Sequence, residues 1–298
     1  MTTVLLVNPA SANGATRRRW PKLARRAAEL GLEGETLVSE HPGHVTELAA
    51  EAIRGGASRL VAVGGDGTVH EVVNGLLSAD AHGVELAVLP RGTGRDFARS
   101  LSIPTSFDDA VRVAVSGAVR AVDAGRASYA GGEAWFANFA GCGISGAIAR
   151  DANKSSKALG GRLSFMVSTV KVFARWKSVA VEVEIDGERR AGPMFEIVAM
   201  NGPYAAGGMK LAPEGRPDDA LLDCVLFGDI TKLDFLTTFP KIYRGGHLAH
   251  PKIEHLRGRT VGIEADQPLP VVLDGEDAGT TPVRFEIVPQ ALRVRVPG

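Results

Sequence analysis

Leu60-Val61-Ala62-Val63-Gly64-Gly65-Asp66-Gly67-Thr68 is the stretch that decides the fold. Its first four residues are apolar and predict a short buried strand, and the segment from Val69 to Leu77 reads as a helix. The glycines between them allow a sharp turn and a close approach of the backbone to a ligand. Amides at the start of the helix favour a phosphate group. The stretch therefore predicts a phosphate-binding loop between a strand and a helix.

Asp66 places a carboxylate among these glycines. A phosphate bound there would repel it unless a cation offset the charge, so Asp66 indicates a Mg²⁺-nucleotide, bound directly or through water. The alternative is a glycine-rich turn in which Asp66 only caps the helix. The full Gly-Gly-Asp-Gly-Thr string between a strand and a helix favours the ligand site.

Strands and helices alternate through the first 124 residues, with expected strands at 4–7, 36–38, 60–63 and 86–89. This alternation predicts an α/β domain with a Rossmann-like parallel sheet that binds ligands at the carboxyl ends of its strands. Beyond residue 125, alternating apolar and polar residues, as in 179–185, predict antiparallel strands. Helical segments near 144–157, 163–176 and 231–243 interrupt them. We therefore expect two domains, 1–124 and 125–298, the second a β-rich antiparallel sandwich with inserted helices.

Composition excludes several classes of protein. The 298 residues carry 34 basic and 34 acidic side chains, so bulk charge indicates no nucleic-acid partner. The two cysteines, Cys142 and Cys224, lie in no metal-binding pattern and predict buried thiols. No apolar stretch approaches the length of a membrane span, and a strand so close to Met1 leaves no room for a signal peptide. We expect a cytoplasmic protein.

Four further strings resemble one family when they are taken together with the glycine loop. Residues 88–99, VLPRGTGRDFAR, are similar to the lipid-kinase motif P-x-G-T-x-N-D-F-A-R. Residues 201–213 resemble its G-GGM-x-x-x-P segment, 217–223 its DDG-x-L-D, and 274–276 its D-G-E. In order and over nearly the whole chain, the sequence resembles the diacylglycerol kinase-like bacterial lipid kinases, which are related to sphingosine, ceramide and NAD kinases.

The resemblance implies a role for each matching residue. Nucleotide contacts are implied for Asn8, Ser39, Gly64, Gly65, Asp66, Gly67, Thr68 and Thr93. An acidic network that organises catalytic Mg²⁺ is implied for Asp66, Asp96 and Asp123. A second, structural Mg²⁺ is implied at Asp219, with main-chain oxygens near Arg216 and Leu221. Asp274 and Glu276 are implied to stand near the acceptor hydroxyl, with Glu276 as general base and Asp274 assisting.

Three features qualify these roles. Asp274-Gly275 also fits an ordinary hairpin turn, and a turn can still present the base. Arg95 stands where the family has Asn, and Ala220 replaces the Gly of DDG. Ala tolerates left-handed φ poorly, which weakens the structural-metal assignment.

The resemblance implies transfer of the γ-phosphoryl group of ATP, with Mg²⁺, to a lipid hydroxyl, with diacylglycerol giving phosphatidic acid as the first expectation. A sphingoid base, ceramide or phosphatidylglycerol stays open as acceptor. NAD kinase shares the glycine loop, but residues 88–99 disfavour it. A non-catalytic nucleotide-binding regulator is the remaining alternative, suggested by Arg95 and Ala220 and opposed by the retained carboxylates.

A lipid acceptor implies a transient, peripheral contact with the inner membrane surface, and it leaves a homodimer open. The densest positive segment is Arg17, Arg18, Arg19, Lys22, Arg25 and Arg26. It fits either a solvated helix face or a surface that attracts anionic phosphates or lipid headgroups. Apolar stripes at helical spacing, Phe165, Met166, Val170 and Phe173, then Phe235, Phe239 and Tyr243, fit either core or an acceptor channel.

Overall fold

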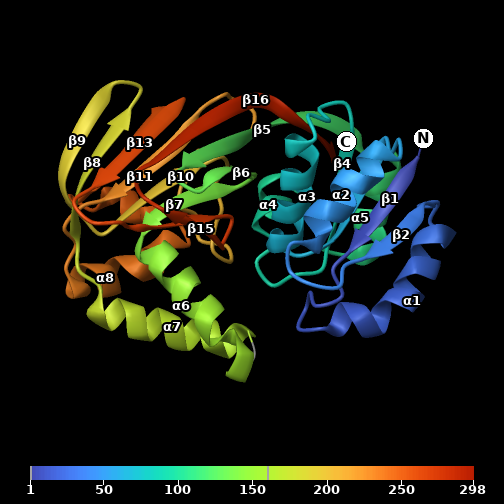
Figure 1. Cartoon of the computed structure of the whole chain (residues 1–298), viewed down its shortest axis with the longest axis horizontal. Helices are drawn as coiled ribbons and strands as arrows, with labels where there is room; N and C mark the ends of the chain where they lie inside the picture. The colour runs from blue at the N-terminus through green and yellow to red at the C-terminus, as the bar shows by residue number, and fades with distance from the viewer. Residues whose placement is uncertain (1, 160) are drawn as a thin grey trace. The chain divides into compact units, whose positions relative to one another are not determined.

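The computed structural model describes residues 2–159 and 161–298 (Figure 1). The chain divides into two compact units, Met1–Ala124 with Pro289–Gly298, and Gly125–Val288. The first is an α/β unit with a parallel sheet and the second is an antiparallel β-rich unit, so the predicted fold class is confirmed.

The first unit is built on four neighbouring parallel strands in the order β2-β1-β3-β4. These strands are β1 (Thr3–Val7), β2 (Glu35–Val38), β3 (Arg59–Gly64) and β4 (Glu85–Pro90). Every residue of β3 and β4 is buried, as expected for central strands covered on both faces. The helices of this unit are α1 (Ala15–Glu29), α2 (His44–Arg54), α3 (Asp66–Ser78), α4 (Asp96–Ser100) and α5 (Phe107–Ser116).

Two long strands, β5 (Ala118–Tyr129) and β16 (Val283–Val296), belong to both units. The end of β16 pairs in parallel with β4, where Arg295 Nε and Arg59 Nε both donate to the buried Glu85 Oε2 at 2.9 and 3.0 Å. This pairing explains why the last residues of the chain belong to the first unit, whereas the sequence assigned all of 125–298 to the second.

The second unit contains a six-stranded antiparallel sheet in the order β12-β11-β10-β7-β14-β15. A second antiparallel set joins β16, β13, β8 and β9, and β6 pairs with β5. The strands not yet bounded are β6 (Gly132–Phe136), β7 (Phe139–Gly143), β8 (Val179–Ile185), β9 (Glu188–Met194), β10 (Glu196–Met200), β11 (Leu222–Phe227), β12 (Ile253–Gly258), β13 (Thr260–Ala265), β14 (Pro270–Leu273) and β15 (Glu276–Thr280).

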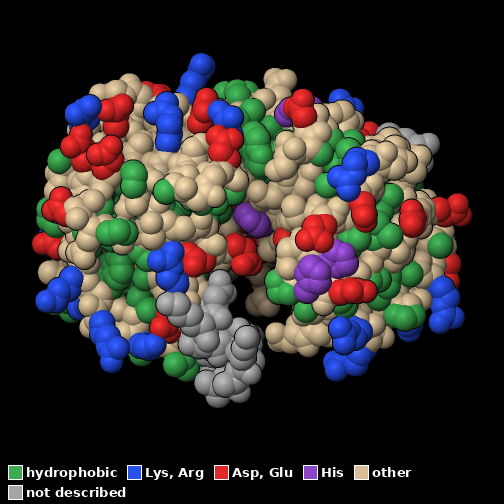
Figure 2. Space-filling view, viewed as in Figure 1, with side chains coloured by type: hydrophobic (Ala, Val, Ile, Leu, Met, Phe, Trp, Pro, Cys, Tyr) green, Lys and Arg blue, Asp and Glu red, His purple; other side chains and the backbone are tan. Residues whose placement is uncertain are grey.

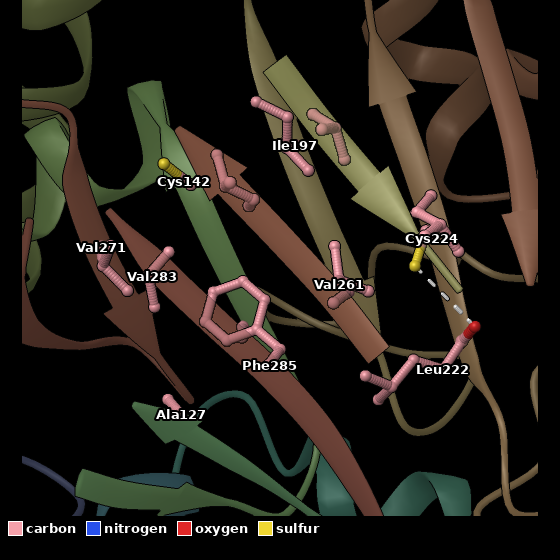
Figure 3. Close-up of a cluster of buried hydrophobic side chains, with 14 of the residues drawn as sticks. Ala127, Cys142, Ile197, Leu222, Cys224, Val261, Val271, Val283 and Phe285 are labelled. Atoms are coloured by element: carbon pink, nitrogen blue, oxygen red, sulfur yellow. Dashed lines mark hydrogen bonds between the residues drawn. The ribbon is translucent and has the colours of Figure 1, made fainter. Parts of the chain in front are cut away.

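Alternate side chains of these strands form the core of the second unit (Figure 3). Phe285 lies at its centre and meets Phe136 edge to face, with ring centroids 5.8 Å apart. Cys142 and Cys224 lie in the same cluster as free, buried thiols, as the sequence predicted. Burial raises the pKa of both thiols, so neither is poised as a thiolate nucleophile.

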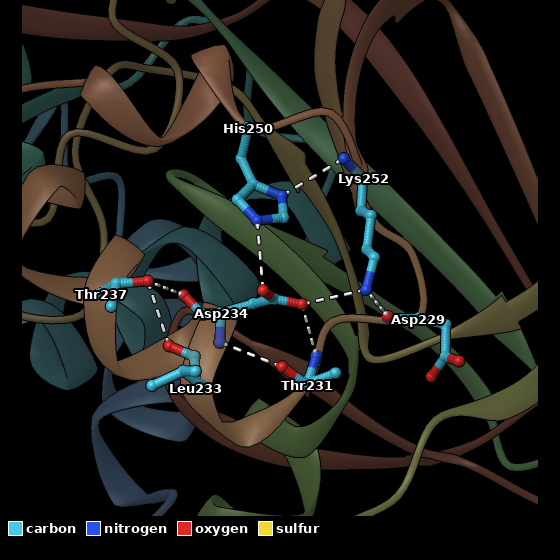
Figure 4. A network of polar contacts seen from close by, with 7 residues as sticks. All are labelled: Asp229, Thr231, Leu233, Asp234, Thr237, His250 and Lys252. Atoms are coloured by element: carbon cyan, nitrogen blue, oxygen red, sulfur yellow. Dashed lines mark hydrogen bonds and ion pairs between the residues drawn. The ribbon is translucent and has the colours of Figure 1, made fainter.

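The helices of the second unit are α6 (Ile144–Leu159), α7 (Gly161–Arg175), α8 (Lys232–Ile242) and the 3₁₀ turn Gly246–Ala249. Helix α8 begins at a capping box in which Thr231 and Asp234 bond each other's backbone amides (Figure 4). Lys252 Nζ reaches the same Asp234 carboxylate at 2.9 Å. These contacts lower the pKa of Asp234 and fix the start of the helix. Among the described helices, none is long and apolar enough to cross a bilayer.

Candidate active site

The residues predicted to contact nucleotide follow the four parallel strands of the first unit. Asn8 follows β1, Ser39 follows β2, Gly64 ends β3, and Thr93 lies beyond β4. The amide of Asn8 bonds Val63 O at 3.1 Å, and that of Ser39 bonds Val7 O at 2.9 Å, so both hold the strand register. Because neighbouring parallel strands end at one edge, these residues share that edge.

Two glycine-containing loops pack against each other at this edge. A β-carbon on Gly65 would lie 3.1 Å from Gly92 Cα, and the amide of Arg91 donates to Gly64 O at 2.6 Å. A β-carbon on Gly64 would lie 2.1 Å from the hydroxyl of Thr68, which accepts a hydrogen bond from Asn8 Nδ2 at 3.1 Å. A side chain at Gly65 would push the two loops apart and one at Gly64 would displace Thr68, so this backbone geometry depends on glycine.

Two of the three predicted metal-organising carboxylates meet beside Gly94. A β-carbon at Gly94 would lie 2.6 Å from Asp66 Oδ2 and 3.4 Å from Asp96 Oδ2. The other oxygens are held: Asp66 Oδ1 accepts the amide of Phe97 at 3.2 Å, and Asp96 Oδ1 accepts Arg99 Nη1 at 2.5 Å. Two carboxylate oxygens that face one point beside a phosphate-binding loop fit Mg²⁺, which prefers oxygen ligands.

Asp123, the third residue of that network, is buried at the point where β5 meets β16. Its Oδ1 accepts the amide of Gln290 at 2.8 Å, and only 1% of the residue is exposed. This contact shows what anchors the carboxylate. No contact among the described residues tests whether Asp123 helps to organise Mg²⁺, so that role stays a prediction.

Asp274 and Glu276 flank the β14–β15 hairpin of the second unit, and their side chains differ sharply. Asp274 and Gly275 both have positive φ, 49° and 100°, as a two-residue hairpin turn requires. The Asp274 carboxylate accepts three successive backbone amides, from Ala137 at 2.8 Å, Asn138 at 2.9 Å and Phe139 at 3.0 Å. Glu276 is exposed and forms no hydrogen bond or ion pair with the described residues. These contacts show what anchors Asp274, and the roles of Glu276 as general base and of Asp274 as its assistant stay predictions.

Asn138 and Asn201 support the Asp274 turn, and sequence reasoning missed both as support residues. Asn201 Nδ2 donates to Ala137 O at 2.9 Å, and Asn138 Nδ2 donates to Tyr204 O at 2.5 Å. Asn201 is the first residue of the 201–213 motif. The motif therefore marked this part of the chain, but it did not predict the hydrogen bond from Asn201 to Ala137.

Comparison with known proteins agrees with this architecture. A family model described as the diacylglycerol kinase catalytic domain matches residues 2–127. A second, described as the YegS C-terminal NAD kinase beta sandwich-like domain, matches residues 138–296. The chain belongs to the diacylglycerol kinase-like family.

Relatives of this diacylglycerol kinase-like protein match along almost their full length. It is 26% identical to a diacylglycerol kinase of Staphylococcus carnosus over 98% of this chain and 94% of that protein. It is 27% identical to a diacylglycerol kinase of Bacillus subtilis over 98% and 95%. A crystal structure of a diacylglycerol kinase from Bacillus anthracis shares the fold, with TM-score 0.74, 23% identity and coverage of 99% and 96%. Family membership supports a kinase, which is a transferase.

The predicted structural-metal site of this diacylglycerol kinase-like protein fits a metal poorly. The Asp219 carboxylate already faces a cation, because Arg257 Nη2 bonds its Oδ2, and its Oδ1 accepts the amide of Leu221 at 3.2 Å. Arg257 also reaches the buried Asp223, at 3.2 Å from Nε to Oδ1, and Arg216 lies 3.5 Å from Asp218. The Asp219 carboxylate therefore has a protein cation as its partner.

The two departures from the family motifs both adopt left-handed backbone. Arg95 has φ 57° and Ala220 has φ 60°. Asn and Gly, which the motifs carry there, adopt this conformation more readily than Arg and Ala. Arg95 forms no ion pair with Asp96 among the described contacts; Asp96 Oδ1 accepts Arg99 Nη1 instead.

The positive segment of α1 is only partly available to a ligand. Arg26 is paired with Asp108 at 2.6 Å and with Glu29 at 3.0 Å. Four other residues of the segment are exposed and form no ion pair with a described residue: Arg17, Arg18, Arg19 and Lys22. On the face shown in Figure 2, basic and acidic side chains are interspersed rather than gathered into one large patch.

Proposed function

We propose that the chain is an ATP-dependent lipid kinase that phosphorylates diacylglycerol to phosphatidic acid. The observation that carries the proposal is the meeting of the Asp66 and Asp96 carboxylates at Gly94, beside two packed glycine loops. A phosphate chain needs backbone donors and a cation, and this edge offers the loops, the start of α3 and ligands for the cation.

The residues divide the chemistry among them. Asp66 and Asp96 would hold Mg²⁺, which would offset charge on the transferring phosphoryl group. The glycine loops position the phosphates, and the Asn8–Thr68 hydrogen bond keeps the start of α3 in place. Glu276 accepts the proton of the acceptor hydroxyl. Asp274 anchors the backbone of residues 137–139 to the hairpin that carries Glu276.

A lipid acceptor is supported by apolar surface on α7 and α8. Five side chains there are between 48% and 70% exposed, Val167, Val170, Leu233, Leu236 and Tyr243. On the same elements, Phe235 meets Phe173 in a tilted arrangement and stacks on Phe239, with ring centroids 4.6 and 5.1 Å apart. Of the two predicted stripes, Val170 and Tyr243 are exposed, whereas Phe173, Phe235 and Phe239 are half-buried. The side chains of Phe165 and Met166 lie outside the described residues.

Exposed basic residues lie on or just after the same helices, among them Arg175, Lys241 and Arg244. Apolar side chains flanked by cations suit a transient contact with an anionic bilayer surface. Replacing Leu233 and Leu236 together by Glu is expected to weaken binding to anionic vesicles while Mg-ATP binding stays unchanged. Unaltered vesicle binding in that variant would count against this surface.

An acceptor panel tests the function. Purified protein, labelled ATP and Mg²⁺ are offered diacylglycerol, a sphingoid base, ceramide, phosphatidylglycerol or NAD. The expected outcome is labelled phosphatidic acid as the main product. Label in NAD alone would favour an NAD kinase. NAD is included because the family model that matches residues 138–296 is described as NAD kinase beta sandwich-like. Label in no acceptor, from protein that binds ATP, would favour a regulator.

A further inference from the structure

Arg91 is fixed at the base of the phosphate-binding edge. It follows the last residue of β4, its amide is bonded to Gly64 O at 2.6 Å, and the next residue, Gly92, touches Gly65. Its guanidinium is half-buried, and its Nε is buried without a hydrogen-bond partner among the described residues. A buried donor of this kind needs an acceptor that the protein itself does not provide.

Two other arginines act on the same guanidinium. Burial lowers the pKa of Arg91, and the positive charges of Arg19 on α1 and Arg95 before α4 lower it further. None of the three forms an ion pair with a carboxylate in the part of the chain that the structure describes. Three like charges brought together without a counter-charge repel one another, and a bound anion would relieve that repulsion.

The backbone conformation of Arg95 also indicates a binding role for its side chain. Its φ of 57° and ψ of 36° are left-handed, a conformation that suits Asn better than Arg. An unfavourable residue at such a position suggests a use for its side chain. Pairing with Asp96 is not that use, because Arg95 forms no ion pair with Asp96 among the described contacts.

We propose that Arg19, Arg91 and Arg95 converge on the polyphosphate chain of the donor nucleotide and bind it together with the two glycine loops. The inference rests on the proposed function for the identity of the donor, and it adds three residues that none of the motifs assigns. A nucleoside triphosphate carries more negative charge than one Mg²⁺ offsets, and the arginines supply the remainder. They therefore favour triphosphate over diphosphate, because each further phosphate gives the guanidinium groups more acceptors.

Calorimetric titration at fixed Mg²⁺ and without any lipid tests the site. The probes are ATP, ADP and inorganic tripolyphosphate, and the variants are Arg19→Gln, Arg91→Gln and Arg95→Asn. Each variant is expected to lose about tenfold in affinity for ATP and tripolyphosphate, the usual scale of one charge-assisted hydrogen bond, and less for ADP. Arg18→Gln, a neighbour on α1 that does not act on Arg91, is the matched control and should bind all three as the parent does.

Melting temperatures separate lost binding from lost folding. Arg95→Asn suits the backbone and Arg19 is exposed, so these two variants decide the matter if Arg91→Gln does not fold. Unchanged ATP affinity in both would overturn the proposal, as would equal losses for ATP and ADP. If the variants lose binding to anionic vesicles but keep their affinity for ATP, the arginines bind lipid headgroups instead, and the polyphosphate site is overturned. The expected pattern in a protein that phosphorylates no lipid would support this site and remove only the proposed acceptor.

Discussion

Gly65 and Gly92 touch backbone to backbone, and a β-carbon on Gly92 would lie only 2.5 Å from Gly65 Cα. The contact joins the loop after β3 to the loop after β4. Each loop leads into a helix that begins with one of the carboxylates beside Gly94, Asp66 on α3 and Asp96 on α4.

Gly92→Ala is expected to weaken Mg-ATP binding strongly and to destabilise the fold by about 1–3 kcal/mol, as overpacking usually does. The methyl group has only backbone to displace, so the loops must separate. Calorimetry and urea denaturation measure the two effects. Gly83→Ala is the control, because nothing lies within 4 Å of a β-carbon there, and it should leave both unchanged. Equal behaviour of the two variants would contradict the close-packed loops.

Glu276→Gln and Asp274→Ala are expected to fail in different ways. Glu276→Gln should lower kcat by about 10²–10⁴-fold, the usual loss for a general base, with stability and ATP affinity unchanged. Asp274→Ala leaves three buried amides without their acceptor, at roughly 1–3 kcal/mol each, so it should lower the free energy of unfolding as well as kcat.

Steady-state kinetics and denaturation of both variants separate the base from the positioning residue. A stable Asp274→Ala variant would contradict the anchoring role of that carboxylate. An intact kcat in Glu276→Gln would show that another group takes the proton.

Glu196 should make stability depend on pH. Burial raises the pKa of its carboxyl from 4.5 to about 7, against the lowering effect of hydrogen bonds from Ser145 at the start of α6. Between these two pKa values the unfolded chain releases the proton while the folded chain keeps it. The free energy of unfolding should therefore fall as pH rises from 4.5 to about 7 and level off above, by an amount on the order of 3 kcal/mol.

Denaturation curves across this pH range, for the parent and Glu196→Gln, measure the effect. The variant cannot ionise at this position, so the part of the slope due to Glu196 should vanish. Parallel pH profiles for the two proteins would refute the buried-carboxyl account.

Ala220→Gly is expected to stabilise the protein, by about 0.5–1 kcal/mol, because φ is 60° there and glycine adopts it without a β-carbon clash. Ala28→Gly, exposed within α1, is the matched contrast and should destabilise by about 1 kcal/mol. Thermal melting of both variants gives the comparison. Melting temperatures that shift in the same direction in both variants would contradict the left-handed strain at Ala220.

The sequence was informative where one segment carried its own signal. The strand at 60–63 and the helix after it were predicted from local apolar pattern and glycine, and β3 and α3 occur there. Helix α5 and strand β12, Ile253–Gly258, were missed. The polar residues of β12 hide its strand pattern: Glu254 pairs with Arg190 on β9, and His255 and Arg257 contact Asp223 on the neighbouring β11.

The candidate site was harder to predict where partners lie far apart in the chain. The amides that hold Asp274 come from residues 137–139, and the cations around Arg91 come from positions 19 and 95. No local pattern encodes such contacts, because sheet order alone brings the segments together. The motif at 217–223 resembles the family's metal-site motif, but its Asp219 bonds Arg257 of strand β12. A local motif could not predict this partner.

The most direct test of the central claim is transfer of the γ-phosphoryl label from ATP to diacylglycerol by the parent and by Asp66→Asn, with Asp109→Asn as an exposed control. Parent and control should form labelled phosphatidic acid, and formation should stop when Mg²⁺ is chelated. Asp66→Asn should fold, yet lose at least about 100-fold in rate, the scale of removing one electrostatic group from a transition state. Near-normal transfer by folded Asp66→Asn, or no labelled lipid from the parent, would contradict the account.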